Sequence, residues 1–133
     1  MGVTISRSIL NGMKKASAAA APREACGLLL GVGSAIARYS ECANVADAPE
    51  IRFEIDPAAL FAALRAERAG GPALLGYWHS HPSGDAAPSA TDAAMAAPDG
   101  KLWIILGGED VTCWRAGETG LWGRFAAEPL LLV

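Results

Sequence analysis

The two histidines of this chain, His79 and His81, come directly after an apolar run at residues 74–78. An apolar run of this length predicts a buried β-strand. Because a strand points residues i and i+2 to the same face, both imidazoles are expected on one side of the sheet. At roughly 6–7 Å apart by strand rise, the two side chains can close on one metal ion.

The composition predicts a single globular domain spanning residues 1–133. Hydrophobic residues make up 52% of the chain and charged residues 19%, which argues against disorder. The net charge is −3 and the basic residues are scattered, so nucleic-acid binding is not expected. The three cysteines lack CxxC spacing, which indicates reduced thiols. No apolar stretch approaches the ~20 residues of a membrane span, and we expect a soluble, cytoplasmic protein.

Hydrophobic periodicity predicts helices mixed with strands, and therefore an α/β layer structure. Helices are expected at residues 5–20, 57–69 and 89–97. Strands are expected at residues 25–31, 35–45, 52–55, 73–79, 101–106, 111–115 and 121–126. Glycine-rich turns separate the last three strands.

The helix at 57–69 has clear boundary signals. Asp56 is a suitable N-cap, and Pro57 fits the first helical position. Gly-Gly-Pro at 70–72 ends the helix. Its expected apolar face consists of Leu60, Phe61 and Leu64.

The residues near the histidines have the chemistry of a hydrolytic zinc centre. A catalytic zinc site needs three protein ligands and an open position. His79 and His81 supply two nitrogens, and Asp92, one turn into the following helix, supplies an oxygen. Glu24 could carry the proton from water to the leaving amine if its strand lies beside the histidine strand. Ser89 could hydrogen-bond the oxyanion of the tetrahedral intermediate.

Each of these residues also has a structural explanation. Ser89-Ala90-Thr91-Asp92 is a plausible capping box, which can coexist with a catalytic role because a cap also orients both side chains. Glu24 alone would be an ordinary surface carboxylate. Cys26 is expected to be a small buried residue rather than a nucleophile, because no third histidine is present to activate it. The tryptophans are expected in or over the core: Trp78, Trp103, Trp114 and Trp122.

Taken together, these residues resemble the motif of the JAMM (MPN-plus) metalloproteases. That pattern is a glutamate, then His-Ser/Thr-His, seven residues, a serine, two residues and an aspartate. Glu24, residues 79–81 and residues 89–92 match it without adjustment, since Pro82 to Pro88 is the seven-residue gap. The resemblance implies a cytidine-deaminase-like fold, a mixed curved β-sheet flanked by helices.

The resemblance also implies roles for the motif residues and a substrate class. It implies that His79, His81 and Asp92 bind Zn²⁺, that Glu24 is the general acid/base and that Ser89 steadies the intermediate. Members of this family cleave peptide or isopeptide bonds at the C-terminal tail of ubiquitin-like proteins.

The segments at 24–31 and 52–57 are similar to the small prokaryotic branch, which is associated with sulfur-carrier and ubiquitin-like proteins. The chain has no room for the insertions with which eukaryotic deubiquitinases grip ubiquitin. The expected partner has a small-residue tail such as Gly-Gly, which could lie along a sheet edge by β-augmentation. A homodimer is also considered, through exposed apolar surface on the first helix.

Two alternatives remain open at this stage. One is a non-catalytic scaffold module of the same fold, although such relatives typically lose ligands that this chain retains. The other is a RadC-like protein acting near DNA, because the loop at residues 81–85 is similar to those relatives. Zinc content tests the first alternative, and salt-sensitive DNA binding tests the second.

Overall fold

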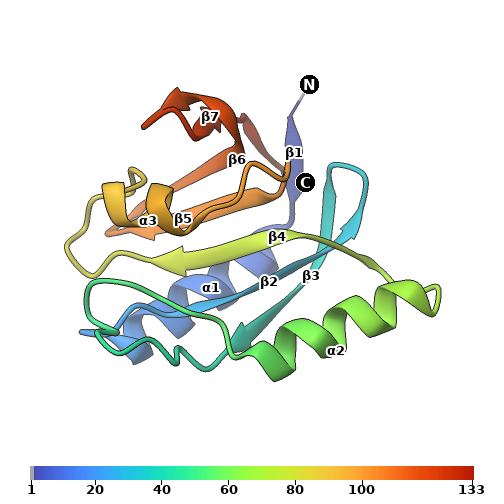
Figure 1. The fold of residues 1–133 in the computed structure, drawn as a ribbon, viewed down its shortest axis with the longest axis horizontal. Coiled ribbons are helices and arrows are strands. Elements are labelled where there is room, and N and C mark those ends of the chain that lie inside the picture. Colours follow the sequence, from blue (N-terminus) through green and yellow to red (C-terminus); the bar gives the residue numbers. More distant parts are fainter. Residues whose placement is uncertain (1) are drawn as a thin grey trace.

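The computed structural model describes residues 2–133 and contains one mixed β-sheet (Figure 1). Its eight strands lie in the order β7-β6-β5-β4-β2-β3-β1-β8. The strands are β1 (Val3–Ile5), β2 (Cys26–Val32), β3 (Ala35–Cys42), β4 (Ala73–Ser80), β5 (Leu102–Gly107), β6 (Asp110–Leu121), β7 (Phe125–Ala127) and β8 (Leu130–Leu132). The helices are α1 (Arg7–Ala20), α2 (Pro57–Arg68) and α3 (Ala90–Met95). The expected α/β fold with a mixed curved sheet is confirmed.

Strand β4 lies in the middle of the sheet and carries the histidines at its end. It pairs antiparallel with β2 and parallel with β5. Its alternating side chains enter two separate apolar cores. Trp78 packs in the core beneath α1, with Leu10 and Met13 of that helix. His79 points to the opposite face, where its ring stacks on Phe53 with centroids 4.3 Å apart. The strand period therefore directs the histidines away from α1.

Both long helices begin with the caps that the sequence contains. The Ser6 side chain accepts the Ile9 N–H at 3.1 Å, and the Asp56 side chain accepts the Ala58 N–H at 3.1 Å. The start and end predicted for α2 are confirmed. The predicted apolar face is wrong for Phe61, which is 61% exposed. Helix α2 contacts β4 but contributes no fully buried side chain.

Several predicted boundaries are wrong. Residues 3–5 form β1, so the first helix begins only at Arg7, and residues 130–132 form an unpredicted strand paired with β1. Strand β6 extends to Leu121, and β7 follows after a tight turn, in place of one strand at 121–126. These differences arise from pairing between distant segments, which local periodicity does not encode.

The predicted strand at 52–55 is replaced by a single bridge. Ile55 pairs with Asn44 alone. The Asn44 side chain accepts the Glu54 N–H at 3.1 Å, so it takes the place of a ladder hydrogen bond. Elsewhere in the described residues, Trp78 and Trp103 are buried as predicted, whereas Trp122 is 57% exposed and belongs to neither core. No helix within residues 2–133 is long and apolar enough to cross a membrane.

Candidate metal centre

The two histidine side chains converge on the side of the sheet facing α3. His79 is fully buried and His81 nearly so. Their Nε2 atoms lie 3.0 Å apart, because the rings turn toward each other from positions i and i+2 of one strand end. The predicted placement on one face is therefore confirmed.

Asp92 completes this cluster from the first turn of α3. Its Oδ1 lies 3.1 Å from His79 Nε2, and its Oδ2 lies 3.1 Å from His81 Nε2. The aspartate is held by a capping box: Ser89 Oγ accepts the Asp92 N–H, and Asp92 Oδ2 accepts the Ser89 N–H, both at 3.0 Å. The same geometry that begins the helix thus aims the carboxylate at both imidazoles.

The loop after β4 sets the proton arrangement of His81. Its Nδ1 donates to the Asp85 carbonyl at 2.7 Å, since a carbonyl can only accept. In the neutral ring, Nε2 then carries the lone pair with which an imidazole can bind a metal ion. The loop is held in turn by β6, where the Thr112 hydroxyl donates to the Ala86 carbonyl at 2.6 Å.

Glu24 reaches the cluster from the residues just before β2. Ser80, the residue between the histidines, accepts the Ala25 N–H with its hydroxyl at 2.8 Å and donates its own N–H to the Ala25 carbonyl at 3.0 Å. The Glu24 N–H donates to the Pro49 carbonyl at 2.7 Å. These bonds attach the backbone around Glu24 both to the histidine strand and to the loop after β3.

Asn44 organises that loop around Glu24. Its Nδ2 donates to the Glu24 carbonyl at 3.0 Å and to the Arg52 carbonyl at 3.1 Å. Its Oδ1 accepts the N–H groups of Ala46 and Glu54, both at 3.1 Å. The Asn44 side chain therefore makes hydrogen bonds that backbone groups of a neighbouring strand would otherwise make. Its bond to the Glu24 carbonyl fixes the main chain at Glu24.

The Glu24 carboxyl group is buried with one oxygen free. The residue is 5% exposed, and its Oε1 has no hydrogen-bond partner within residues 2–133. Ligand atoms of Glu24, His79 and His81 all lie within 4.8 Å of one another. Burial raises the pKa of Glu24 from 4.5 to about 7, a value suited to accepting and releasing a proton near neutrality. The alternative of a surface carboxylate is excluded by this burial.

The electrostatics of the cluster favour a bound cation. Burial opposes the charge on Asp92, but contacts with both imidazoles outweigh it and hold the pKa of Asp92 well below its usual range. Burial lowers the pKa of His79. For His81 burial also acts downward, but the carboxylate of Asp92 and the carbonyl of Asp85 raise the pKa overall. An ionised carboxylate beside two imidazole rings, whose nitrogens can bind a metal once deprotonated, is a ligand set of the kind that binds divalent metals.

The donor atoms and the free Glu24 oxygen together fit a metal ion. Four potential ligand atoms, His79 Nε2, His81 Nε2 and the two carboxylate oxygens of Asp92, are linked by contacts of 3.0–3.1 Å, close enough for the three residues to contact one ion. The Glu24 oxygen is farther from the histidines and has no protein partner within residues 2–133, so a polar group beside the ion could bond to it.

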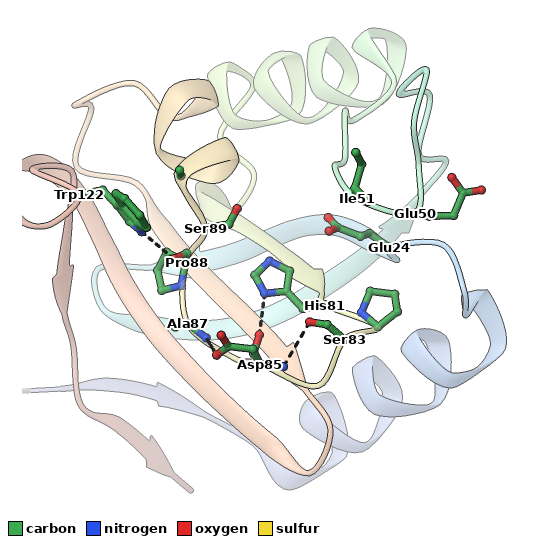
Figure 2. Close-up of a pocket in the computed structure, with 12 residues that line it drawn as sticks. Glu24, Glu50, Ile51, His81, Ser83, Asp85, Ala87, Pro88, Ser89 and Trp122 are labelled. Atoms are coloured by element: carbon green, nitrogen blue, oxygen red, sulfur yellow. Dashed lines mark hydrogen bonds between the residues drawn. The ribbon is translucent and has the colours of Figure 1, made fainter.

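A groove of about 390 Å³ leads from the surface to these residues. Glu24, His81 and Ser89 line its inner part. Figure 2 shows Trp122 on one side of these residues and Ile51 with Glu50 on the other. The Trp122 Nε1–H donates to the Pro88 carbonyl at 2.9 Å, next to Ser89.

The structure brings together all five residues predicted from the sequence, but sequence reasoning missed their supports. No supporting role was predicted for Asn44 or Ser80: Ser80 bonds to Ala25, 55 residues away, and Asn44 bonds to backbone groups of an irregular loop that no local pattern predicts. Trp122 was expected in or over the core, although its position in a Gly-Leu-Trp-Gly turn at 120–123 could have suggested an exposed tip. Cys26 is buried as predicted, and burial raises the pKa of its thiol to about 12, which suppresses nucleophilicity.

Comparison with known proteins identifies the family. Residues 6–117 match the family described as prokaryotic homologs of the JAB domain. The desampylase of Haloferax volcanii is 35% identical over 100 residues, which cover 74% of this chain and 72% of that protein. A probable TtuB-protein conjugate cleaving protease of Thermus thermophilus is 40% identical over 76 residues, covering 57% of this chain and only 51% of the relative.

Solved structures agree with this assignment at the level of the fold. The solution structure of protein DSY2949 from Desulfitobacterium hafniense superposes with a TM-score of 0.83 at 26% identity, covering 98% of this chain and 92% of that one. A structure described as a JAMM metalloprotease-like zinc site gives a TM-score of 0.62 at 20% identity, covering 100% of this chain and 99% of that one. The chain belongs to the prokaryotic JAMM/MPN-plus family and is a hydrolase of the isopeptidase type.

Proposed function

We propose that this protein is a zinc-dependent peptidase and isopeptidase that hydrolyses the bond following the C-terminal tail of a ubiquitin-like or sulfur-carrier protein. The observation that carries the proposal is the buried Glu24 oxygen without a partner in residues 2–133, beside two imidazoles that share one carboxylate. The names of both curated relatives, a desampylase and a conjugate cleaving protease, support the substrate class.

In this proposal His79, His81 and Asp92 hold the zinc, and Glu24 does not. The contacts of 3.1 Å between Asp92 and both histidines support this division, because Glu24 lies farther away. When bound, zinc supplies Lewis acidity, which polarises a substrate carbonyl and lowers the pKa of water toward ~7.

Glu24 acts as the general base and then as the general acid. Its pKa of about 7 allows the carboxylate to take a proton from the attacking water and return it to the leaving amine. Ser89 donates a hydrogen bond from its hydroxyl to the oxyanion. Its Oγ already accepts the Asp92 N–H at 3.0 Å, so the hydroxyl is oriented and its own proton is available.

The site architecture favours a groove rather than strand addition as the mode of tail binding. The open edges of the sheet are β7 and β8, and neither carries one of the five site residues. Both strands at the cluster, β2 and β4, are already paired on their two sides. In place of β-augmentation at a sheet edge, we therefore propose that the tail lies in the groove above His81.

Zinc content and cleavage test the proposal together. The substrate is a ubiquitin-like protein fused through a Gly-Gly tail to a reporter, and metal is measured by mass spectrometry after zinc-replete purification. Wild type should hold one zinc and cleave, H81A should lose zinc, and E24Q should keep zinc while losing at least about 100-fold in rate. A protein without stoichiometric zinc would favour a scaffold role. E24Q cleavage at the wild-type rate would refute the assignment of Glu24.

A further inference from the structure

Trp122 is an exposed aromatic side chain held in a fixed position. It lies in the turn between β6 and β7, with φ of 58°, a left-handed conformation that is uncommon for residues other than glycine. Its indole N–H is anchored to the Pro88 carbonyl at 2.9 Å. A large exposed apolar ring, anchored in strained backbone beside a reactive centre, points to a binding role rather than to core packing.

The groove places Trp122 across the reactive centre from a second exposed surface. Ile51, which is 65% exposed, and the exposed Glu50 lie in the loop after β3 that also fixes Glu24. Figure 2 shows His81 and Ser89 between these residues and Trp122. A chain that crosses the centre must therefore pass Trp122 on one side and Glu50 with Ile51 on the other.

The charged side chains that line the groove include several carboxylates. Its lining includes the carboxylates of Glu24, Glu50 and Asp85, and it includes no lysine or arginine. The described cation nearest in sequence to Glu50, Arg52, lies 3.8 Å from Asp47 in an exposed ion pair. Bound Zn²⁺ would offset the carboxylates of Asp92 and Glu24 at the centre, so the uncompensated negative charge of the groove lies at Glu50 and Asp85, where it attracts a cationic group.

We propose that Trp122 and Glu50 determine which sequence around the cleaved bond the enzyme accepts: an extended segment that places a lysine or arginine beside Glu50 on the tail side of the bond and packs an apolar surface against the Trp122 ring on the other side. This inference rests on the proposed function, since it assumes that the bond to be cleaved lies between these two contacts. It assigns the substrate a chemistry, a cationic residue close to the cleaved bond, that the metal site alone does not specify.

The Trp122 contact is tested by steady-state kinetics on the Gly-Gly fusion. Trp122→Ala should raise KM by about 5–10-fold, as expected for a buried aromatic anchor, with a much smaller change in kcat. Trp122→Phe should recover most of the affinity. Phe61→Ala is the matched control, because Phe61 is equally exposed but lies on α2 and does not line the groove. Equal KM values for wild type, Trp122→Ala and Phe61→Ala would overturn the inference.

The Glu50 contact is tested with tails that differ only in charge. Three fusions carry Lys, Gln or Glu at the position before Gly-Gly. Wild type should prefer Lys over Glu by about 10-fold in kcat/KM at low salt, and the preference should shrink as salt screens it. Glu50→Gln should reduce this ratio several-fold, whereas Glu118→Gln, an exposed carboxylate outside the groove, should leave it unchanged. An unchanged ratio in Glu50→Gln would refute the charge assignment.

A binding measurement separates this inference from the proposed function. Zinc-loaded E24Q is titrated with synthetic peptides in which Lys-Gly-Gly or Glu-Gly-Gly is followed by five further residues, so that each peptide spans both contacts, and isothermal titration calorimetry measures binding. If wild type cleaves no fusion, the proposed function fails, yet tighter binding of the Lys peptide that Trp122→Ala and Glu50→Gln weaken would still support the groove. If the fusions are cleaved and both variants bind both peptides like the parent, the groove inference fails alone.

Discussion

Gly107 ends β5 where the loop after the histidines crosses it, and replacing it with alanine should misalign His81 without touching that residue. A Cβ at position 107 would lie 2.5 Å from Ala86 N and 2.6 Å from Asp85 C. Both are backbone atoms, so the loop must retreat by about 1 Å to reach ordinary contact. A displacement of that size away from His81 would stretch the 2.7 Å hydrogen bond from His81 Nδ1 to the Asp85 carbonyl beyond hydrogen-bond range.

The expected cost has two parts. Overpacking against backbone should lower the free energy of unfolding by about 1–3 kcal/mol. Loss of the carbonyl that orients a metal-ligating histidine should weaken zinc binding by about 10–100-fold. Competition with a fluorescent zinc chelator measures the affinity, and urea denaturation of the metal-free protein measures the stability.

Two control variants separate misalignment from general destabilisation. Gly117→Ala in β6 adds a methyl group where no atom lies within 4 Å, and it should change neither quantity. Ile5→Val, in the core beneath α1, should cost about 0.5–1.5 kcal/mol of stability and leave zinc affinity unchanged. If Gly107→Ala binds zinc as tightly as these controls, the loop does not orient His81, and the reasoning is refuted.

Two further predictions concern Glu24 and its support. In metal-free protein, burial raises the pKa of Glu24 to about 7, so its stabilising contribution as the neutral acid is lost as pH rises from 4.5 through 7. Glu24→Gln does not titrate, so its free energy of unfolding should rise by up to about 3 kcal/mol relative to that of wild type between pH 5 and pH 8. Urea denaturation in the presence of chelator measures both proteins, and the same difference in free energy of unfolding at both pH values would contradict this prediction. Asn44→Ala should destabilise the protein by about 2–3 kcal/mol and lower kcat at least about 10-fold while zinc content is retained, because Glu24 loses its main-chain support. Asn44→Asp keeps the Oδ1 acceptor, so it should be less stable than wild type but more stable than Asn44→Ala. Loss of zinc in either variant would argue against an effect through Glu24.

Much of the fold could be predicted because its signals are local. Asp56 and Pro57 predict the start of α2, where Asp56 is the N-cap and Pro57 is the first helical residue. The strand at 73–79 was recognised from its apolar run. Strands β1 and β8 were not, because they are short segments defined by pairing with distant parts of the chain, β1 with β3 and β8, and β8 with β1. Residues 52–55 alternate like a strand, yet Asn44 supplies the hydrogen bond that a neighbouring strand would have supplied.

The candidate site divides in the same way. The sequence alone determined the proposed ligand set: strand periodicity puts His79 and His81 on one face, and the capping box at the start of α3 orients Asp92. Both depend only on backbone geometry within a few residues. Only the tertiary structure decided that Glu24 is buried against these ligands, and that Trp122 lies beside them outside the core. Their positions depend on contacts between distant segments, such as Ala25 with Ser80 and Trp122 with Pro88, and those contacts exist only once the sheet has formed.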